Sequence, residues 1–230
     1  MAKVLCIGDL HEPASRKGYL QFCKDLYRKW DCNKVVFIGD VADFHAISRH
    51  EKEPQCKGPQ DEYLFTKARI AKWYAAFPNA VLALGNHDLR PERMAKCVSI
   101  PKTFLKSYNE LWGTKSWTWE SEFEIDGVTY RHGTGFGGKY PACTAMTAER
   151  GNIVIGHCHA RAEIVWSASR KNRIFGMSVG CGIDQEAYQF AYGVDLKDRP
   201  FLSAGVVIDG VPYLIPMPIG PKERYHDSKF

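Results

Sequence analysis

Four short apolar segments of this chain end in the same way, with a glycine and then an Asp, Asn or His. The apolar segments are 2–7, 34–38, 80–84 and 152–155, and the polar endings are 8–11, 39–43, 85–88 and 156–159. Short aliphatic runs closed by glycine are typical of buried strands that end in a turn. Open sheets build their sites at the carboxyl ends of their strands. The repeated ending therefore predicts one site at one edge of a sheet.

The order of the predicted elements indicates the fold class. Strands at 3–7, 34–38 and 80–84 alternate with helices at 15–30 and 59–77, which is typical of crossover units in a mainly parallel sheet. Leu64, Ala68, Ala71 and Ala75 form an apolar face of the second helix. Two shorter helices are predicted at 91–98 and 101–111.

The second half of the chain has a different rhythm. Strands are predicted at 116–125 and 128–132, joined by an Asp126-Gly127 hairpin turn, then a helix at 141–150 and strands from 153 and at 162–168, 173–179, 201–208 and 211–215. We predict an α/β (α+β) fold in which two sheets pack together and helices cover them. A single domain is expected over residues 1–220, followed by a polar tail over 221–230.

Composition narrows the class of protein. No window of the 230 residues approaches the ~18 consecutive apolar residues of a membrane span, and the first strand leaves no room for a signal peptide. A cytoplasmic protein is therefore expected, without a membrane partner. The eight cysteines form no Cys-x-x-Cys pair and are expected to be reduced thiols, which argues against a zinc ribbon. The net charge of +5 is too small to identify nucleic acid as a partner, and nothing in the sequence indicates the oligomeric state.

The polar endings supply carboxylate, amide and imidazole groups, the donors that divalent cations bind in proteins. A single His or a Gly-Asp turn is more often structural, but four of the eight histidines fall at these endings and a fifth, His132, ends the predicted strand 128–132. The candidate metal ligands are Asp9, His11, Asp40, Asn86, His132, His157 and His159. Seven donors exceed the needs of one tetrahedral ion and suit two metals that share a carboxylate.

The endings also form an ordered set of motifs. Gly-Asp-x-His occupies 8–11, Gly-Asp-x-x-Asp occupies 39–43 and Gly-Asn-His-Asp occupies 85–88; a His-Gly pair follows at 132–133 and Gly-His-x-His at 156–159. In order, spacing and strand context, the chain resembles the calcineurin-like metallophosphoesterase superfamily. The resemblance implies a four-layer αββα sandwich of two mixed β-sheets flanked by helices.

The resemblance further implies a role for each residue. Asp9, His11 and His159 would hold one metal, Asn86, His132 and His157 the other, and Asp40 would bridge them. His87 would be catalytic and would donate a proton or hydrogen bond to the leaving oxygen, with Asp43 orienting it. Two divalent ions about 3.5–4 Å apart would form a bridging hydroxide that attacks phosphorus in line. We expect Mn²⁺, with Fe, Zn, Ni or Co as alternatives.

Two positions at which this chain differs from the protein phosphatases of the superfamily bear on the identity of its substrate. Phe44 stands where the protein serine/threonine phosphatases of the superfamily carry a phosphate-contacting Arg, and Asp88 stands where their third motif has Glu. The chain is more similar to the phosphodiesterase and nuclease-type members, so the expected phosphate ester is a nucleotide or nucleic acid. The alternatives are a phosphomonoesterase acting on phosphoprotein or small metabolites, and a non-catalytic scaffold.

Three further features are interpreted as structural. Cys158 lies between His157 and His159, so its side chain should point away from theirs. The glycine-rich stretch 133–138 lacks the arrangement of a P-loop and is expected to be a plain loop. Trp112, Trp117 and Trp119 could stack on a base, but a place in the core is favoured.

Overall fold

The computed structural model describes residues 1–49, 54–184, 186–187 and 198–219. Within them, the first sheet has six strands in the order β11-β10-β1-β2-β3-β4. Strands β1 to β4 run parallel, and β10 and β11 extend the sheet antiparallel. The bounds are β1 (Lys3–Ile7), β2 (Lys34–Phe37), β3 (Val81–Ala83), β4 (Thr118–Glu120), β10 (Ser203–Ile208) and β11 (Val211–Pro216).

Within the described residues, the second sheet has five strands in the order β5-β6-β7-β9-β8. Strands β6, β7 and β9 run parallel, and the edge strands β5 and β8 run antiparallel to their neighbours. The bounds are β5 (Glu122–Ile125), β6 (Val128–Arg131), β7 (Asn152–Ile155), β8 (Ala162–Ala168) and β9 (Arg173–Val179). Both sheets are therefore mixed.

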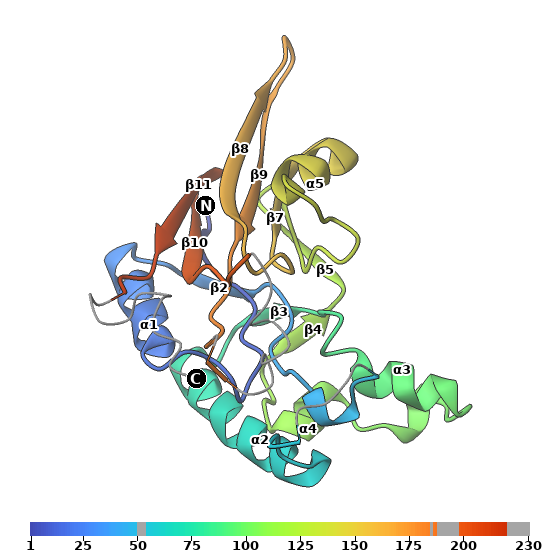
Figure 1. Ribbon diagram of the computed structural model, residues 1–230. Helices are drawn as coiled ribbons and strands as arrows, with labels where there is room; N and C mark the ends of the chain where they lie inside the picture. Colours follow the sequence, from blue (N-terminus) through green and yellow to red (C-terminus); the bar gives the residue numbers. More distant parts are fainter. Residues whose placement is uncertain (50–53, 185, 188–197, 220–230) are drawn as a thin grey trace.

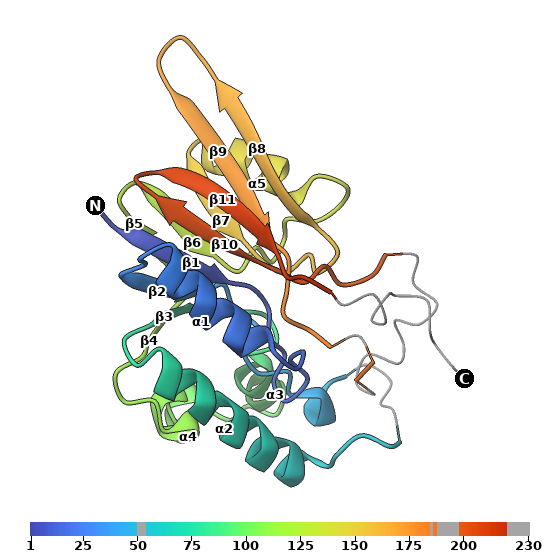
Figure 2. The same cartoon turned by 90° about the vertical axis from the view of Figure 1, so that its left-hand side faces the viewer.

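Helices cover the outer faces of both sheets (Figure 1). They are α1 (Tyr19–Lys29), α2 (Pro59–Ala76), α3 (Arg90–Cys97), α4 (Tyr108–Trp112) and α5 (Pro141–Glu149), with 3-10 helices η1 (His45–Ile47) and η2 (Lys102–Phe104). Side chains from α1, α2 and α4 share a core cluster with the first sheet, whereas α5 packs on the second. Figure 2 shows α1 and α2 from their outer side.

Alternation along the strands explains the layers. In β1, Leu5 and Ile7 join the core beneath the helices, whereas Val4 and Cys6 join the core between the two sheets. Successive side chains of a strand point to opposite faces, so a strand that is apolar throughout is buried on both faces. The predicted αββα sandwich of two mixed sheets is confirmed.

Two predicted elements are divided in the structure. The segment 116–125 forms β4 and β5, which pair with β3 in the first sheet and β6 in the second. The segment 101–111 forms η2 and α4, because Leu105 is extended and Ser107 starts α4 with a capping box to Glu110.

The predicted apolar face of α2 is wrong. Its buried residues are Glu62, Thr66, Ile70 and Trp73, whereas Leu64 is 51% exposed. The Glu62 carboxylate accepts hydrogen bonds from the backbone N–H groups of His45 and Ala46 at 2.6 and 2.8 Å. A buried polar group that is fully hydrogen-bonded in this way can face the core.

Other details agree with the sequence. Asp126 and Gly127 have φ values of 51° and 73°, as a tight hairpin turn requires, and Trp112 and Trp117 are buried in the core. No helix in the described ranges combines the length and apolar character needed to cross a membrane. The predicted tail over 221–230 lies outside the described residues.

The segment after β9 returns to the first strand. The Gly182 N–H donates to the Asp9 carbonyl at 2.8 Å, and Cys181 forms a parallel bridge with Asp9. The backbone that follows β1 is therefore held by residues from the last quarter of the chain.

Candidate metal centre

All nine residues singled out from the sequence lie at or just beyond the carboxyl ends of five strands, and they converge in space. Asp9 and His11 follow β1, Asp40 and Asp43 follow β2, and Asn86 and His87 follow β3. His132 follows β6, and His157 and His159 follow β7. Five loops from two sheets thus meet at one edge.

The first group of donors comes from the segments that follow β1, β2 and β7. His159 Nε2 lies 3.0 Å from Asp9 Oδ2 and 3.1 Å from His11 Nε2, and His11 Nε2 lies 3.5 Å from Asp40 Oδ2. Asp9, His11 and Asp40 are at most 1% exposed. Two imidazole nitrogens facing each other at this distance share a region where a cation can bind both lone pairs.

The second group lies beside it. His132 Nε2 lies 3.1 Å from Asn86 Oδ1, 3.2 Å from His157 Nδ1 and 3.2 Å from Asp40 Oδ2. The Oδ2 atom of Asp40 therefore faces both groups. A carboxylate in this position suits two cations held side by side.

The second ring nitrogens of His132 and His11 are bonded in a way that orients these two histidines. His132 Nδ1 lies 2.9 Å from the Ile38 carbonyl oxygen, and His11 Nδ1 lies 2.7 Å from Asp43 Oδ1. In each ring Nδ1 donates a hydrogen bond to the oxygen, so Nε2 is the nitrogen that faces the other donors. This is the usual arrangement of a histidine that binds metal.

Two glycines allow the loops to approach this closely. A Cβ atom at Gly85 would collide with the side chain and backbone nitrogen of Asp40, and one at Gly156 would collide with Asp9 Oδ1. Glycine occurs in strand-end turns of this kind where another chain segment packs against the backbone. The glycines of the motifs are thus part of the geometry of the site.

Three donor residues have strained backbones. His11, Asp40 and His157 have φ values of 48°, 48° and 66°, in the left-handed region. Such residues cost on the order of 1–3 kcal/mol each and cluster at functional sites. Here the strain is held by hydrogen bonds: the His11 N–H donates to the Asp40 carbonyl at 2.9 Å, and the His157 N–H donates to Asp9 Oδ2 at 3.0 Å.

The buried charges compensate one another. Burial opposes ionisation of Asp40, but the charge and hydrogen bond of His132 hold the pKa of this carboxyl well below its usual range. Burial also disfavours a charged His132, yet Asp40 and Asp9 raise its pKa to about 10. His11 is different, because burial and the neighbouring His87 lower its pKa to about 4. The site therefore concentrates negative charge around Asp40, which a cation would balance as the proton on His132 now does.

His87 belongs to the same cluster without facing the shared donor regions. Its Nδ1 atom lies 2.7 Å from Asp43 Oδ1, and its backbone N–H donates to Asp40 Oδ1 at 2.7 Å. The pKa of His87 is raised, because the Asp43 hydrogen bond and the charge of Asp40 outweigh burial. Asp43 holds His11 and His87 together.

Two residues of the third loop, Asp88 and Arg90, were given no role in the site from the sequence. Asp88 is buried and accepts hydrogen bonds from the backbone N–H groups of Gly85 and Ala42 at 3.0 and 3.1 Å, which ties two turns together. Arg90 lies with Nη2 3.0 Å from His87 Nε2, and its Nη1 donates to the Asp43 carbonyl at 2.7 Å. The three-residue spacing of His87 and Arg90 at the start of a helix was the available signal.

The tryptophans and Cys158, which were interpreted as structural, contact residues outside the donor set. The ring of Phe44 packs on Trp112 with centroids 5.6 Å apart. The thiol of Cys158 donates to the Phe136 carbonyl at 3.3 Å, in the glycine-rich loop. Trp119 stacks on Tyr108 with centroids 4.8 Å apart.

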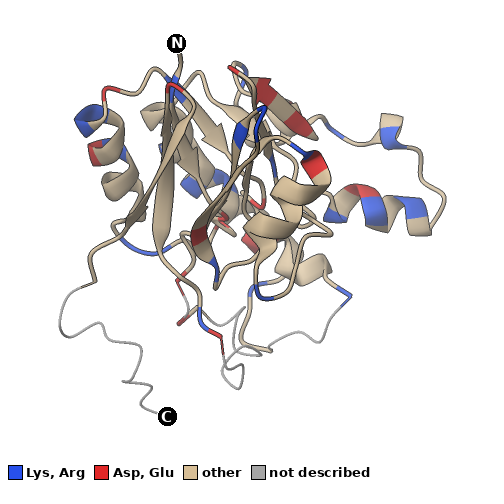
Figure 3. Ribbon diagram, turned by 90° about the horizontal axis from the view of Figure 1, so that it is seen from above, with Lys and Arg blue, Asp and Glu red and all other residues tan. Residues whose placement is uncertain are grey.

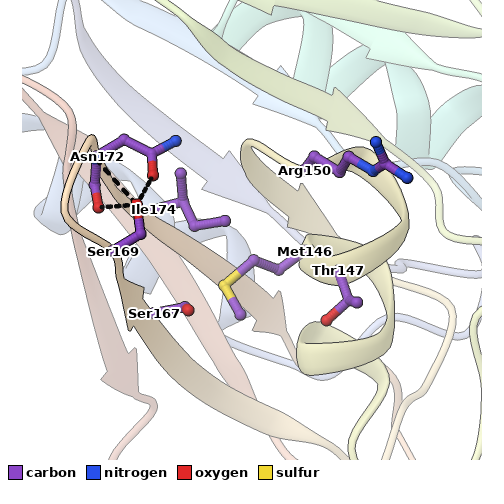
Figure 4. Close-up of a pocket in the computed structure, with 7 residues that line it drawn as sticks. All are labelled: Met146, Thr147, Arg150, Ser167, Ser169, Asn172 and Ile174. Carbon is purple, nitrogen blue, oxygen red and sulfur yellow. Dashed lines mark hydrogen bonds between the residues drawn. The ribbon is translucent and has the colours of Figure 1, made fainter.

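A separate cavity of about 290 Å³ lies between α5 and the β8–β9 hairpin (Figure 4). It is lined by Met146, Thr147, Arg150, Ser167, Ser169, Asn172 and Ile174. Ser169 Oγ and Asn172 Oδ1 lie 2.6 Å apart and bond to each other across the hairpin turn. None of the nine residues lines this cavity, which is separate from the metal centre.

Carboxylate, amide and imidazole donors in this arrangement fit divalent cations. Three groups of side chains in the described part of the chain have donor atoms within 4.8 Å of one another, and all three draw on the predicted residues. They are Asp9, His11, Asp40 and His159; Asp40, His132 and His157; and His11, Asp43 and His87.

Comparison with solved structures finds several proteins of similar overall arrangement. Vps29 from Chaetomium thermophilum is 12% identical, with a TM-score of 0.49 over 96% of this chain and 92% of that one. YfcE, a phosphoesterase from E. coli, is 13% identical, with a TM-score of 0.41 over 94% and 100%. The Pseudomonas putida nuclease MPE is 12% identical, with a TM-score of 0.39 over 93% and 86%. Similarities this distant carry no functional argument.

No curated protein matches the sequence. A family model does match, over residues 2–175, and its description is calcineurin-like phosphoesterase. The matched range includes every donor residue and all of the strands that carry them, and it confirms the resemblance seen in the motifs. The chain belongs to the calcineurin-like phosphoesterase family.

Proposed function

We propose that this protein is a metal-dependent phosphodiesterase of the nuclease type, acting on nucleotides or nucleic acid. The observation that carries the proposal is the position of Asp40 Oδ2, 3.5 Å from His11 Nε2 and 3.2 Å from His132 Nε2. A scaffold protein has no need of a buried carboxylate shared by two sets of converging donors, because such a site is costly without a cation.

The proposed cofactor is a pair of divalent cations, with Mn²⁺ the preferred metal and Fe, Zn, Ni or Co as alternatives. One would be held by Asp9, His11 and His159, and the other by Asn86, His132 and His157, with Asp40 common to both. Bound cations would supply Lewis-acid chemistry, lowering the pKa of water and neutralising charge on a phosphoryl group.

In this proposal His87 supplies a proton to the leaving group, and Asp43 orients the His87 ring. Asp43 accepts from Nδ1 of His87 and so directs Nε2 outwards, where it can donate a proton to the leaving oxygen of an ester. Arg90 Nη2 lies 3.0 Å from that same Nε2. Because a protonated Nε2 cannot accept from a guanidinium, Arg90 must turn away when His87 is charged. A phosphoryl oxygen of the substrate is its natural new partner.

The preference for diesters rests on Phe44. Its side chain is turned towards Trp112 in the core, so no guanidinium reaches the site from the position that is Arg in the protein phosphatases. The alternative is a phosphomonoesterase acting on phosphoprotein or small metabolites.

The decisive assay compares bis-p-nitrophenyl phosphate with p-nitrophenyl phosphate, using purified protein supplemented with Mn²⁺. We expect metal-dependent turnover of the diester in preference to the monoester, together with bound metal in elemental analysis. Faster turnover of the monoester would favour the alternative. Absence of both turnover and bound metal would leave only the scaffold.

We also propose a cytoplasmic location. All eight cysteines are free, and four of them, Cys6, Cys23, Cys32 and Cys181, are buried. Free thiols are usual in a reducing compartment. Locating a tagged copy in fractionated cells would test this, and recovery outside the cytoplasm would contradict it.

A further inference from the structure

A segment with a high net positive charge follows the third loop of the metal centre. Residues 90–106, here called the basic arm, comprise α3, η2 and the segments that join them to each other and to α4. The arm contains five cationic residues, Arg90, Arg93, Lys96, Lys102 and Lys106, and one acidic residue, Glu92. This balance of +4 compares with +5 for the whole chain. Figure 3 shows Lys and Arg on the helices that project at this edge of the molecule.

The surface of the basic arm is open and combines two kinds of side chain. Glu92 is paired with Lys102 at 2.9 Å, so the acid is neutralised within the arm. Arg93 and Lys96 are exposed. Large apolar side chains lie among these cations: Phe104 is 79% exposed and Val98 is 67% exposed. A further cation, Arg49, contributes from the loop after η1, where it donates to the thiol of Cys97.

The basic arm starts inside the site. Arg90, the first residue of α3, lies 3.0 Å from Nε2 of His87. Arg93 and Lys96 follow at three-residue intervals along one ridge of the helix, and a rise of about 1.5 Å per residue places Lys96 roughly 9 Å further along the axis. A track of positive charge therefore leads from the catalytic histidine to the surface.

We propose that the basic arm binds single-stranded nucleic acid and guides its backbone to the metal centre, an inference that rests on the proposed phosphodiesterase function. Proteins bind single strands through cations that follow the phosphates and aromatic side chains on which bases stack. The arm offers both, with Phe104 as the exposed ring. An anionic membrane would also attract cations mixed with apolar residues, but membrane adsorption gives no reason for the track to end at His87.

The test compares three variants with the wild-type protein. Arg93→Glu combined with Lys96→Glu reverses the track without touching the donors, and Phe104→Ala removes the ring. Lys29→Glu combined with Lys72→Glu, at exposed positions of α1 and α2, is the control with the same change in charge. Each protein is assayed with Mn²⁺ on bis-p-nitrophenyl phosphate and on a single-stranded DNA oligonucleotide. Binding of the labelled oligonucleotide is followed by fluorescence anisotropy against salt concentration, in a His87→Ala background that prevents cleavage.

The arm variant is expected to keep its turnover of the small diester, whereas its kcat/KM on the oligonucleotide falls by about tenfold or more. The slope of log Kd against log salt concentration should shrink by roughly 1.4, since each single-strand phosphate contact contributes about 0.7. Phe104→Ala should weaken binding by about fivefold or more, the effect of losing one stacked base. The control should behave as the wild type does.

Equal oligonucleotide binding by the arm variant and the control would overturn the proposal, whatever the diesterase result. Unchanged oligonucleotide binding by the arm variant, together with its loss of binding to vesicles that contain phosphatidylserine, would also overturn the proposal. That result would make the basic arm a membrane-binding surface. If the wild type does not hydrolyse the small diester, the proposed function fails. A selective loss of oligonucleotide binding in the arm variants would then still establish the arm as a nucleic-acid surface.

Discussion

The Nδ1 atom of His87 lies 2.7 Å from Oδ1 of Asp43. The same oxygen lies 2.7 Å from Nδ1 of His11. One carboxylate therefore orients the proposed proton donor and a proposed metal ligand at once. Substitutions at His87 and at Asp43 should consequently differ in their effects.

Replacing His87 by alanine should lower turnover by about 10²–10⁴-fold, the usual contribution of a general acid. Metal content should stay close to that of the wild type, because His87 is not among the proposed ligands. Steady-state kinetics and elemental analysis of the same preparation provide the measurement. Loss of both metals in this variant would show that His87 has a different role.

Replacing Asp43 by asparagine should affect metal binding as well as turnover. The amide cannot accept fully from both His11 and His87, and loss of such a supporting contact typically weakens metal affinity by about 10–100-fold. Titration with Mn²⁺ would measure the affinity, and His87→Ala is the matched control. Wild-type affinity in Asp43→Asn would mean that the contact with His11 does not support the metal.

Replacing Asp40 by asparagine should remove both cations together. The Oδ2 atom of Asp40 faces both donor groups, so the loss of its charge weakens each. Metal per mole of protein is the measurement, with activity as a second readout. One ion retained at full occupancy in an active enzyme would contradict a shared ligand.

Replacing Gly85 by alanine should reduce metal binding although glycine supplies no donor. The added Cβ collides with Asp40 and forces the two turns apart. Gly137→Ala is the control, because nothing lies within 4 Å of the Cβ position there. Metal content and thermal unfolding of both variants separate local displacement from global destabilisation. Equal metal content in the two variants would argue against the close packing of these turns.

Metal affinity should depend on pH through His132. Burial would lower its pKa, but Asp40 and Asp9 raise it to about 10, so a cation must displace a proton at neutral pH. Below pH 10, affinity for Mn²⁺ should rise about tenfold per pH unit for each proton released. Calorimetry at pH 8 in buffers of different ionisation enthalpy counts the protons. Affinity independent of pH would mean that His132 is neutral or is not a ligand.

Ionisation of His132 should also make the stability of the metal-free protein depend on pH. A folded-state pKa near 10 lies above the value of about 6.5 for an unfolded histidine. The stabilisation is complete below pH 6.5 and is lost as the pH rises through 10. Denaturant unfolding in the presence of a chelator should therefore show lower stability at pH 10 than at pH 6, with the opposite trend contradicting the ion pair.

The donor residues could be predicted because each follows a strand, and the ends of parallel strands share one edge of a sheet. The order of the motifs then indicated which family the chain resembles. Arg90 could not be placed in the same way, because its contact with His87 depends on where α3 begins after the turn. The resemblance suggested the αββα layers, and the alternation in β1 explains them.

The errors have physical causes. The inner face of α2 is set by Glu62 and Thr66, which bond to backbone groups of residues distant in the sequence, so apolar periodicity selected the wrong side. The division between β4 and β5 was hidden because alternation continues through both strands and does not specify the sheet. For residues 101–111, the capping box at Ser107 was a readable sign of a new helix.

The backbone bond from Gly182 to Asp9 has a practical consequence. Every proposed ligand precedes residue 160, and the family match ends at residue 175, so a truncated protein of that length would keep the complete donor set. It would nevertheless lack Gly182, which donates to the Asp9 carbonyl, as well as β10, which pairs with β1, and β11, which pairs with β10. Such a truncation should lose the ability to retain its cations, so the motif-bearing first three quarters of the polypeptide would not suffice as a minimal enzyme.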